Sequence, residues 1–262
     1  MKRMSTSPTD LFSIAAKTAL VTGGSRGIGK MIAEGFVDAG AVVYISSRKA
    51  EVCEQVAAEL SEKGTCVPVP ADLSQEDECR RLADEMATRV DRLDILVNNA
   101  GATWGAPLDD YDEKAFERVL GLNVKGVFHV TKFLVPLLEK AGTQEEPARV
   151  INIGSIDGIG VPMMETYAYS ASKAAVHQLT RHLAKRLAPA ITVNAIAPGP
   201  FESKMMAATL EAFGDQIKAS APLRRIGRPD DMAGAAIFLS SRAGAYVTGA
   251  VIPVDGGIAT TR

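Results

Sequence analysis

Short runs of apolar residues recur along the chain and are separated by longer stretches with helical spacing. The runs are rich in Val and Ile and do not alternate with polar residues, which is typical of strands buried on both faces of a parallel sheet. Seven such runs are present: Thr18–Thr22, Ala41–Ile45, Thr65–Pro70, Leu93–Asn98, Arg149–Ile153, Ile191–Ala197 and Val247–Val254. The pattern therefore predicts a parallel sheet of about seven strands.

The stretches between these runs place apolar residues on one helical face. Three groups show this spacing: Ile32, Phe36 and Val37; Val52, Val56 and Leu60; and Leu82, Met86 and Val90. Strands that alternate with helices predict the α/β class, here a three-layer Rossmann fold with a doubly wound parallel sheet. No Pro/Gly/Ser-rich linker divides the chain, so we expect residues 1–262 to form a single domain. The least regular long segment, Pro198–Pro222, is interpreted as a loop over the site.

Composition and charge exclude several classes of protein. The chain has 262 residues, with 29 Lys and Arg against 31 Asp and Glu. This near-neutral balance gives no electrostatic reason to expect a nucleic-acid partner. No apolar run is long enough to span a membrane, and polar residues follow Lys2 and Arg3 where a signal peptide needs an apolar run, so we expect neither feature. Three cysteines without a CxxC pair, and histidines without metal-ligand spacing, predict no metal site and a reducing, cytoplasmic location.

The first predicted strand ends in a glycine-rich turn that leads into a helix. The turn reads Thr22-Gly23-Gly24-Ser25-Arg26-Gly27-Ile28-Gly29. Glycines at such a turn let the backbone approach a pyrophosphate, and the helix N-terminus supplies free N–H groups. The segment also nearly matches a P-loop, but Met31 stands where that motif needs a Ser or Thr hydroxyl. We therefore favour a dinucleotide site over a nucleoside triphosphatase or a turn without a ligand.

The end of the second predicted strand indicates which dinucleotide binds. An acidic residue there would bind the ribose 2′-hydroxyl of NAD(H), whereas a cation accommodates the 2′-phosphate of NADP(H). The chain has Arg48 at this place and no carboxylate before Glu51. Arg26 adds a second guanidinium, and two such groups can form forked contacts to a phosphate. We therefore predict NADP(H).

Five motifs in order carry a resemblance that extends from about Lys17 to Gly257. They are Thr22–Gly29, Asp72-Leu73, Asn98–Gly101, Asn123, and Ser155 with Tyr169–Lys173, and Pro198-Gly199 follows them. This set resembles the short-chain dehydrogenase/reductase family. Within that family the chain is similar to the NADPH-dependent 3-oxoacyl reductases, of the rhamnolipid-associated type, which share the run Ala148–Ser155.

The resemblance implies roles for particular positions. Asp72 and the Leu73 backbone would lie near the adenine, Asn99 and Gly101 near the cofactor ribose, and Pro198 to Ser203 over the nicotinamide. Phe201 stands where the family usually has Ile or Val, and its larger ring could narrow the pocket. The expected cofactor-binding residues are Gly23, Ser25, Arg26, Gly27, Ile28, Gly29, Arg48, Asp72, Leu73, Asn99, Ala100, Gly101, Tyr169, Lys173, Pro198, Gly199, Phe201 and Ser203.

The spacing of Tyr169 and Lys173 explains how the chain could transfer a proton. The two residues are four positions apart, so their side chains share one helical face. We expect the ammonium, together with an oxidised nicotinamide, to lower the pKa of Tyr169 from its ordinary value of about 10. Ser155, at the end of a strand, can bond the same carbonyl oxygen. The resemblance adds Asn123, which would hold a water that connects Lys173 to solvent.

These observations predict an enzyme that transfers hydride from NADPH to the ketone of a 3-oxoacyl thioester, with catalytic residues Asn123, Ser155, Tyr169 and Lys173. The alternatives are an NADP-dependent dehydrogenase for another small ketone or alcohol (a sugar, polyol or steroid) and a cofactor-sensing regulator. Glu145-Glu146 stands where carrier-protein reductases have basic residues. A coenzyme A thioester or a free ketone is therefore slightly favoured over a substrate bound to an acyl carrier protein. The resemblance also implies a homotetramer assembled through the helices after Asp112 and Tyr167.

Overall fold

A seven-stranded parallel sheet forms the centre of the molecule in the computed structural model, which describes residues 7–203 and 206–261. The strand order is β3-β2-β1-β4-β5-β6-β7, and every neighbouring pair is parallel. The strands are β1 (Thr18–Thr22), β2 (Val42–Ser46), β3 (Thr65–Pro68), β4 (Ile95–Asn98), β5 (Ala148–Ile153), β6 (Ile191–Pro198) and β7 (Val251–Val254). The predicted sheet of seven strands in a Rossmann-type fold is confirmed.

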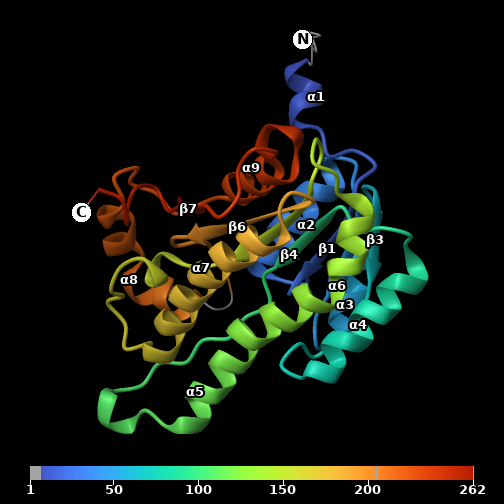
Figure 1. The fold of residues 1–262 in the computed structure, drawn as a ribbon. Coiled ribbons are helices and arrows are strands. Elements are labelled where there is room, and N and C mark those ends of the chain that lie inside the picture. The colour runs from blue at the N-terminus through green and yellow to red at the C-terminus, as the bar shows by residue number, and fades with distance from the viewer. Residues whose placement is uncertain (1–6, 204–205, 262) are drawn as a thin grey trace.

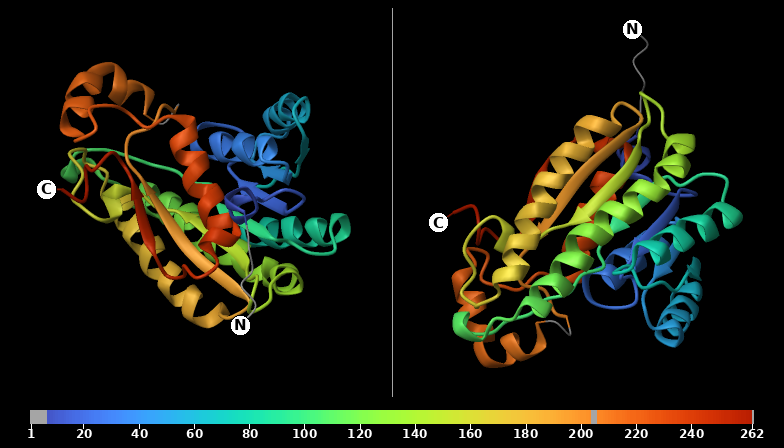
Figure 2. Two further views of the ribbon diagram at one scale, coloured as in Figure 1. Left: turned by 90° about the horizontal axis from the view of Figure 1, so that it is seen from above. Right: turned by 60° about the horizontal axis from the view of Figure 1, so that its bottom comes forward.

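Helices cover both faces of this sheet (Figures 1 and 2). One face packs against α2 (Gly27–Asp38), α3 (Ala50–Ser61) and α9 (Pro229–Ser240). The other packs against α4 (Glu76–Arg89), α6 (Val127–Ala141) and α7 (Tyr167–Leu187). The remaining helical elements are α1 (Pro8–Phe12), η1 (Leu108–Asp110), α5 (Glu113–Leu120), η2 (Gly121–Gly126), η3 (Ile156–Gly158), α8 (Ala207–Ser220) and η4 (Arg242–Gly244). Each face has its own buried apolar cluster, as three layers require.

Two of the predicted helical faces need correction by one residue. In α3 the buried positions are Cys53, Val56, Ala57 and Leu60, whereas Val52 is exposed. Helix α4 ends at Arg89, so Val90 lies just outside the helix, although it packs against the same buried cluster as Leu82 and Met86. Val52 and Cys53 are adjacent, and a small rotation of the helix decides which of them meets the sheet.

The interpretation of Pro198–Pro222 as an irregular loop is wrong. This segment contains α8, a helix of 14 residues. The helix lies beside the N-terminal end of α7 and the segment that leads into α5 (Figures 1 and 2). The segment therefore places a regular element next to the carboxyl ends of β5 and β6.

The last strand is shorter than the predicted run Val247–Val254. Gly249 has a φ of +74° and interrupts the extended backbone before β7. The Asn194 side chain of β6 binds this stretch, because its Nδ2 donates to the Val247 carbonyl at 2.7 Å and its Oδ1 accepts from the Ala250 amide at 3.1 Å. Over the first residues of the run, hydrogen bonds from the Asn194 side chain thus take the place of backbone hydrogen bonds between β6 and β7.

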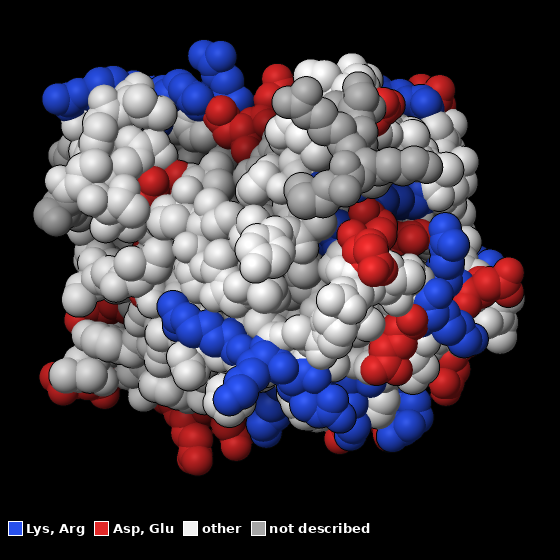
Figure 3. Space-filling model, turned by 45° about the horizontal axis from the view of Figure 1, so that its top comes forward, with Lys and Arg blue, Asp and Glu red and all other residues white. Residues whose placement is uncertain are grey.

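Of the two acidic residues at Glu145-Glu146, Glu146 is paired with basic side chains. Its carboxylate lies 2.9 Å from the Lys17 ammonium and 3.0 Å from the buried Arg149 guanidinium. On the face that comes forward when the top of the molecule is tilted toward the viewer, charged groups of both signs surround a broad uncharged region (Figure 3). Within the described ranges, no helix combines the length and the apolar character that a membrane span requires.

Candidate active site

The glycine turn after β1 forms a narrow backbone cradle at the carboxyl edge of the sheet. Gly23 has a φ of +64°, a conformation that side chains other than glycine rarely adopt. A Cβ at Gly29 would collide with the Gly23 carbonyl oxygen and with Asn99 Nδ2. The first turn of α2 follows directly, and its N-cap residue, Arg26, makes no side-chain capping hydrogen bond. The free N–H groups and the close backbone fit the phosphates of a dinucleotide.

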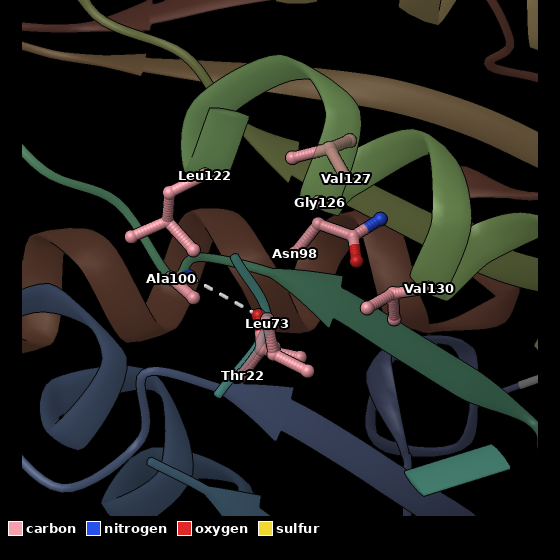
Figure 4. A pocket seen from close by; sticks show the side chains of 8 residues that line it. All are labelled: Thr22, Leu73, Asn98, Ala100, Leu122, Gly126, Val127 and Val130. Atoms are coloured by element: carbon pink, nitrogen blue, oxygen red, sulfur yellow. Dashed lines mark hydrogen bonds between the residues drawn. The ribbon is translucent and has the colours of Figure 1, made fainter. Parts of the chain in front are cut away.

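Thr22 and Asn99 join this turn to the end of β4. The Thr22 hydroxyl oxygen accepts hydrogen bonds from the backbone amides of Asn99, at 2.9 Å, and Ala100, at 3.1 Å. The Asn99 side chain donates through Nδ2 to the carbonyls of Thr22 and Gly23. Figure 4 shows the hydrogen bond between Ala100 and Thr22, which lies in the lining of a small cavity to which η2 contributes Leu122 and Gly126. Strands β1 and β4 flank the point where the strand order reverses, which is where doubly wound sheets bind ligands. Thr22 was missing from the predicted site, although it begins the glycine motif.

Two exposed arginines flank the turn. Arg26 lies in the turn itself and Arg48 follows β2, and neither forms an ion pair with another described residue. Lys30, the lysine of the near P-loop, binds instead to both carboxylate oxygens of Glu59 at 2.8 Å. The P-loop alternative is therefore wrong in geometry as well as in sequence. The arrangement leaves two guanidinium groups free for a phosphate.

Asp72 and Leu73 follow β3 and lie on the same edge. Asp72 Oδ1 accepts from the Ser74 amide and hydroxyl, which fixes the turn into α4. The Leu73 side chain is buried in the core. Its carbonyl oxygen lies close to Gly126, where a Cβ would approach it to 2.6 Å. Leu73 therefore offers backbone and not side chain to the site.

Asn123 lies in a π-helical turn, η2, between α5 and α6. Its side chain is buried: Oδ1 accepts from the Ala102 amide at 2.8 Å, and Nδ2 donates to the Ala102 carbonyl and to Ser172 Oγ, both at 2.9 Å. Asn123 therefore does not face the solvent, although an isolated asparagine in a helical stretch commonly does. A π turn is frequent at functional sites, and here it points the amide at the segment after β4 and at α7.

Ser155, Tyr169 and Lys173 come together where β5 meets α7. Ser155 lies two residues after the end of β5 and caps η3, because its Oγ accepts from the Asp157 amide at 3.1 Å. The buried Lys173 reaches back along α7, and its Nζ donates to the Ile153 carbonyl at 2.7 Å and lies 5.5 Å from the centre of the Tyr169 ring. Ser172, which the prediction also missed, links Asn123 to the Tyr169 carbonyl at 2.7 Å. The four predicted catalytic residues thus occupy one site.

The titration of the tyrosine differs from the expectation. Burial raises the pKa of Tyr169 to about 12, while a hydrogen bond with Ser155 opposes the shift and the Asp157 charge adds to it. Burial also lowers the pKa of Lys173 to about 8, and the Asp157 carboxylate opposes that shift. The residues of the chain alone therefore keep Tyr169 protonated instead of favouring tyrosinate.

The segment after β6 closes one side of the site. The Gly199 amide donates to the Val254 carbonyl at 3.0 Å. A Cβ at Gly27 would lie 3.2 Å from Ser203 Cβ, so this segment meets the glycine turn. The expectation that the Phe201 ring narrows the pocket is wrong, because this ring is buried in the core against Gly227. The remaining predicted residues, Ser25, Ile28, Gly101 and Pro198, lie on the same edge of the sheet.

Comparison with known proteins agrees with this geometry. A family model described as enoyl-(acyl carrier protein) reductase matches residues 23–259. A rhamnolipids biosynthesis 3-oxoacyl-[acyl-carrier-protein] reductase of Pseudomonas aeruginosa is 52% identical over 250 residues, which cover 94% of this chain and 97% of the relative.

Two solved structures resemble the whole chain. The Pseudomonas aeruginosa RhlG/NADP active-site complex matches with a TM-score of 0.92 and 51% identity, over 95% of this chain and 99% of the other. A gluconate 5-dehydrogenase of Burkholderia cenocepacia, in complex with NADP and tartrate, matches with a TM-score of 0.90 and 33% identity, over 97% and 99% of the two chains. The chain belongs to the short-chain dehydrogenase/reductase family.

Proposed function

We propose that this protein is an NADP(H)-dependent reductase that converts the ketone of a 3-oxoacyl thioester to a secondary alcohol. The observation that carries the proposal is the convergence of Ser155, Tyr169 and Lys173 at the carboxyl end of β5, beside a dinucleotide cradle. The substrate class is supported by the 52% identity to the rhamnolipid 3-oxoacyl reductase. The choice of NADP(H) is supported by the similar RhlG structure, which is a complex with NADP, and by the exposed Arg26 and Arg48.

Each residue of the chain has a distinct part in this chemistry. NADPH supplies the hydride when it is bound. Tyr169, held protonated by its buried position, donates a proton to the carbonyl oxygen, and Ser155 bonds the same oxygen as charge develops there. Lys173 keeps a positive charge beside the tyrosine and is placed to bind the ribose hydroxyls. Asn123 holds the segment after β4 against α7 and is placed to hold a water next to Lys173.

Apolar side chains near the site support an acyl substrate. The segment between η3 and α7 exposes Val161 (95% accessible) and Met163 (84%), with Met164 beside them. It is hydrogen-bonded to the segment before α5 through the Ala106 amide and the Glu165 carbonyl, at 3.2 Å. That second segment exposes Trp104 and Leu108. Methionine and aromatic side chains in contact with solvent are suited to cover an alkyl chain. Met205, a further methionine in the segment after β6, lies outside the described residues.

A substrate panel tests the proposal. NADPH and NADH oxidation would be followed with 3-oxoacyl coenzyme A thioesters, carrier-protein thioesters, sugar and polyol ketones and a steroid ketone. We expect the thioesters to be reduced fastest, and with NADPH. Turnover of a sugar acid or another small ketone in place of every thioester would favour the alternative, which the likeness to the gluconate 5-dehydrogenase supports. Tight NADPH binding without any turnover would favour a cofactor-sensing regulator.

The 3-oxoacyl chain can be carried by an acyl carrier protein or by coenzyme A. The pairing of Glu146 with Lys17 and Arg149 removes one objection to an acidic carrier protein. Arg181 and Lys185 on α7 are exposed and could contact one. Both kinds of thioester are therefore proposed as substrates, and the panel distinguishes them by the kcat/KM measured with each.

We further propose that residues 1–262 act as one catalytic domain in a cytoplasmic homotetramer. A groove of about 430 Å³ on the outer face of α7 supports self-association. It is lined mainly by apolar side chains of α6 and α7: Phe128, Ala175, Leu179 and Leu183, with Gln178, His182 and Arg186 at its border. The free thiols of Cys53, Cys66 and Cys79, all buried, support a reducing compartment.

A further inference from the structure

The hydroxyl group of Tyr111 joins two segments next to the candidate active site. It donates to the Trp104 carbonyl at 3.2 Å and accepts from the Ala168 amide at 3.2 Å. Tyr111 stands between η1 and α5, whereas Ala168 lies in the first turn of α7, one residue before Tyr169. One hydroxyl therefore connects the segment after β4 to the helix that carries the proposed proton donor.

The hydrogen bond to Ala168 supplies a cap that the residues around the start of α7 do not provide. The N-cap residue, Thr166, makes no side-chain capping bond. The first N–H groups of a helix have no partner within it, and Tyr111 satisfies one of them from another element. The ring of Tyr111 also makes edge-on contacts with the rings of Tyr167 and Phe116, at 5.3 and 5.6 Å between centres. These contacts fix the ring and, with it, the hydroxyl.

The segment after β4 follows the part of α7 that contains Tyr169. At one end, a Cβ at Gly101 would lie 3.8 Å from Lys173 Nζ. At the other end, a Cβ at Gly105 would lie 3.4 Å from Thr166 Cγ2. Because Tyr169 lies between Thr166 and Lys173 along the helix, the segment borders the site on this side.

Trp104 is the large exposed side chain in the middle of this segment, and the backbone is held on either side of it. Two positions before it, Ala102 is bound to Asn123 through both of its backbone groups. Two positions after it, the Ala106 amide donates to the Glu165 carbonyl at 3.2 Å. The tryptophan itself is 44% accessible. An aromatic side chain on a fixed backbone offers apolar contact to a ligand at a low cost in ordering.

We propose that Trp104 forms a wall of the site for the acyl chain and that Tyr111 is the positioning residue that holds this wall next to Tyr169. The inference rests on the function proposed above, because it needs a substrate with an alkyl chain. A long chain extends from the reacting ketone past Trp104 and gains apolar contact there, whereas a short chain ends before it. Discrimination between chain lengths therefore depends on the Tyr111 hydroxyl, although that hydroxyl bonds only to the protein.

The test compares kcat/KM for 3-oxododecanoyl and 3-oxobutyryl coenzyme A, with NADPH, in wild type, Tyr111→Phe and Trp104→Ala. Tyr111→Phe keeps the ring and removes only the hydroxyl. We expect the ratio of the long to the short substrate to fall about 5-fold in Tyr111→Phe, the effect of one hydrogen bond, and about 10-fold in Trp104→Ala, mainly through KM.

The matched control is Tyr246→Phe, which removes the hydroxyl of a fully exposed tyrosine and should keep the wild-type ratio. Equal losses with both substrates in Tyr111→Phe overturn the positioning role. An unchanged ratio in Trp104→Ala overturns the wall. If Tyr111→Phe does not fold, the ratio in Trp104→Ala, which alters an exposed side chain, decides the matter.

A second readout needs neither turnover nor cofactor. Trp104 is the only tryptophan of the chain, so tryptophan fluorescence reports on this segment alone. We expect Tyr111→Phe to lower the fluorescence anisotropy, because the segment loses its bond to α7, and Tyr246→Phe to leave it unchanged. An anisotropy in Tyr111→Phe equal to that of wild type overturns the inference. Absence of turnover with every thioester would refute the proposed function separately, and the anisotropy would still test the hold of Tyr111 on Trp104.

Discussion

Arg26 and Arg48 differ from Lys30 and Lys63, which form ion pairs with carboxylates. Lys30 is bound to Glu59 and Lys63 to Glu34, whereas the two arginines have no carboxylate partner among the described residues. A guanidinium without a carboxylate partner can bind a phosphate without the free-energy cost of first breaking an ion pair. This difference underlies the preference for NADP(H) over NAD(H).

Replacement of Arg48 is therefore expected to affect one cofactor and spare the other. We expect Arg48→Ala to lower kcat/KM for NADPH by about 10- to 100-fold, because a charge-assisted hydrogen bond is lost. The value for NADH should change little. Steady-state kinetics with both cofactors measures the ratio, and Arg89→Ala, which removes an exposed arginine of α4, is the control. Equal losses with NADPH and NADH would show that Arg48 does not read the 2′-phosphate.

Asn123 shows how a single side chain can hold two elements together. It satisfies both the amide and the carbonyl of Ala102 and also bonds Ser172 on α7. The side chain is 1% accessible, so these bonds are shielded from bulk solvent. The π turn of η2 is what brings it to this position.

We expect Asn123→Ala to destabilise the fold and to slow the reaction. The amide and carbonyl of Ala102, both part-buried, would lose their partner, at a cost of up to about 1–3 kcal/mol each. Chemical denaturation measures the loss of stability, and the rate is measured with saturating NADPH and substrate. Lys125→Ala changes an exposed residue of the same π turn and should leave both quantities near wild type. An unchanged midpoint for Asn123→Ala would contradict the structural part of this role.

At the level of elements, the strands were predictable and the segment over the site was not. All seven strands were found because residues buried on both faces leave a continuous apolar run. Helix α8 was missed because its sequence contains Gly214 and lies among prolines, so local propensity gives a weak helical signal. The inward turn of Phe201 depends on its contact with Gly227, which is distant in sequence and has no local signature.

The site residues were recognisable as a set, but their electrostatics were not. The Tyr169–Lys173 spacing predicted a shared face, whereas the raised pKa of Tyr169 arises from burial and from Asp157, which lies on another element. Thr22 and Ser172 act through hydrogen bonds that depend on how β4 and η2 pack. Such contacts between elements cannot be read from the order of residues along one element.

The outer face of α6 and α7 is the feature of the whole molecule that points to assembly. Phe128 is 41% accessible and lines the apolar groove with Leu179 and Leu183. Burying such a surface against a second copy would stabilise an oligomer by removing apolar area from water. The proposed tetramer places these helices at a subunit interface.

We expect Phe128→Glu to reduce the oligomer to a smaller species, because it introduces a charge into that groove. Sedimentation velocity of the wild type and the variant gives the masses, and Phe213→Glu, a change at another exposed phenylalanine, is the control. A wild-type chain that sediments as a monomer at micromolar concentration would refute the tetramer. An unchanged tetramer in Phe128→Glu would place the interface elsewhere.

The central claim is that Tyr169 donates the proton in NADPH-dependent reduction of a 3-oxoacyl thioester. The chain offers its own control, because Tyr167 lies on the same helix, is also a tyrosine, and bonds Glu165 at 2.8 Å instead of facing Lys173. The measurement is the rate of NADPH oxidation with a 3-oxoacyl coenzyme A thioester by wild type, Tyr169→Phe and Tyr167→Phe. We expect Tyr169→Phe to lose at least about 100-fold in kcat and Tyr167→Phe to keep the wild-type rate. A Tyr169→Phe variant that oxidises NADPH as fast as wild type would contradict the account.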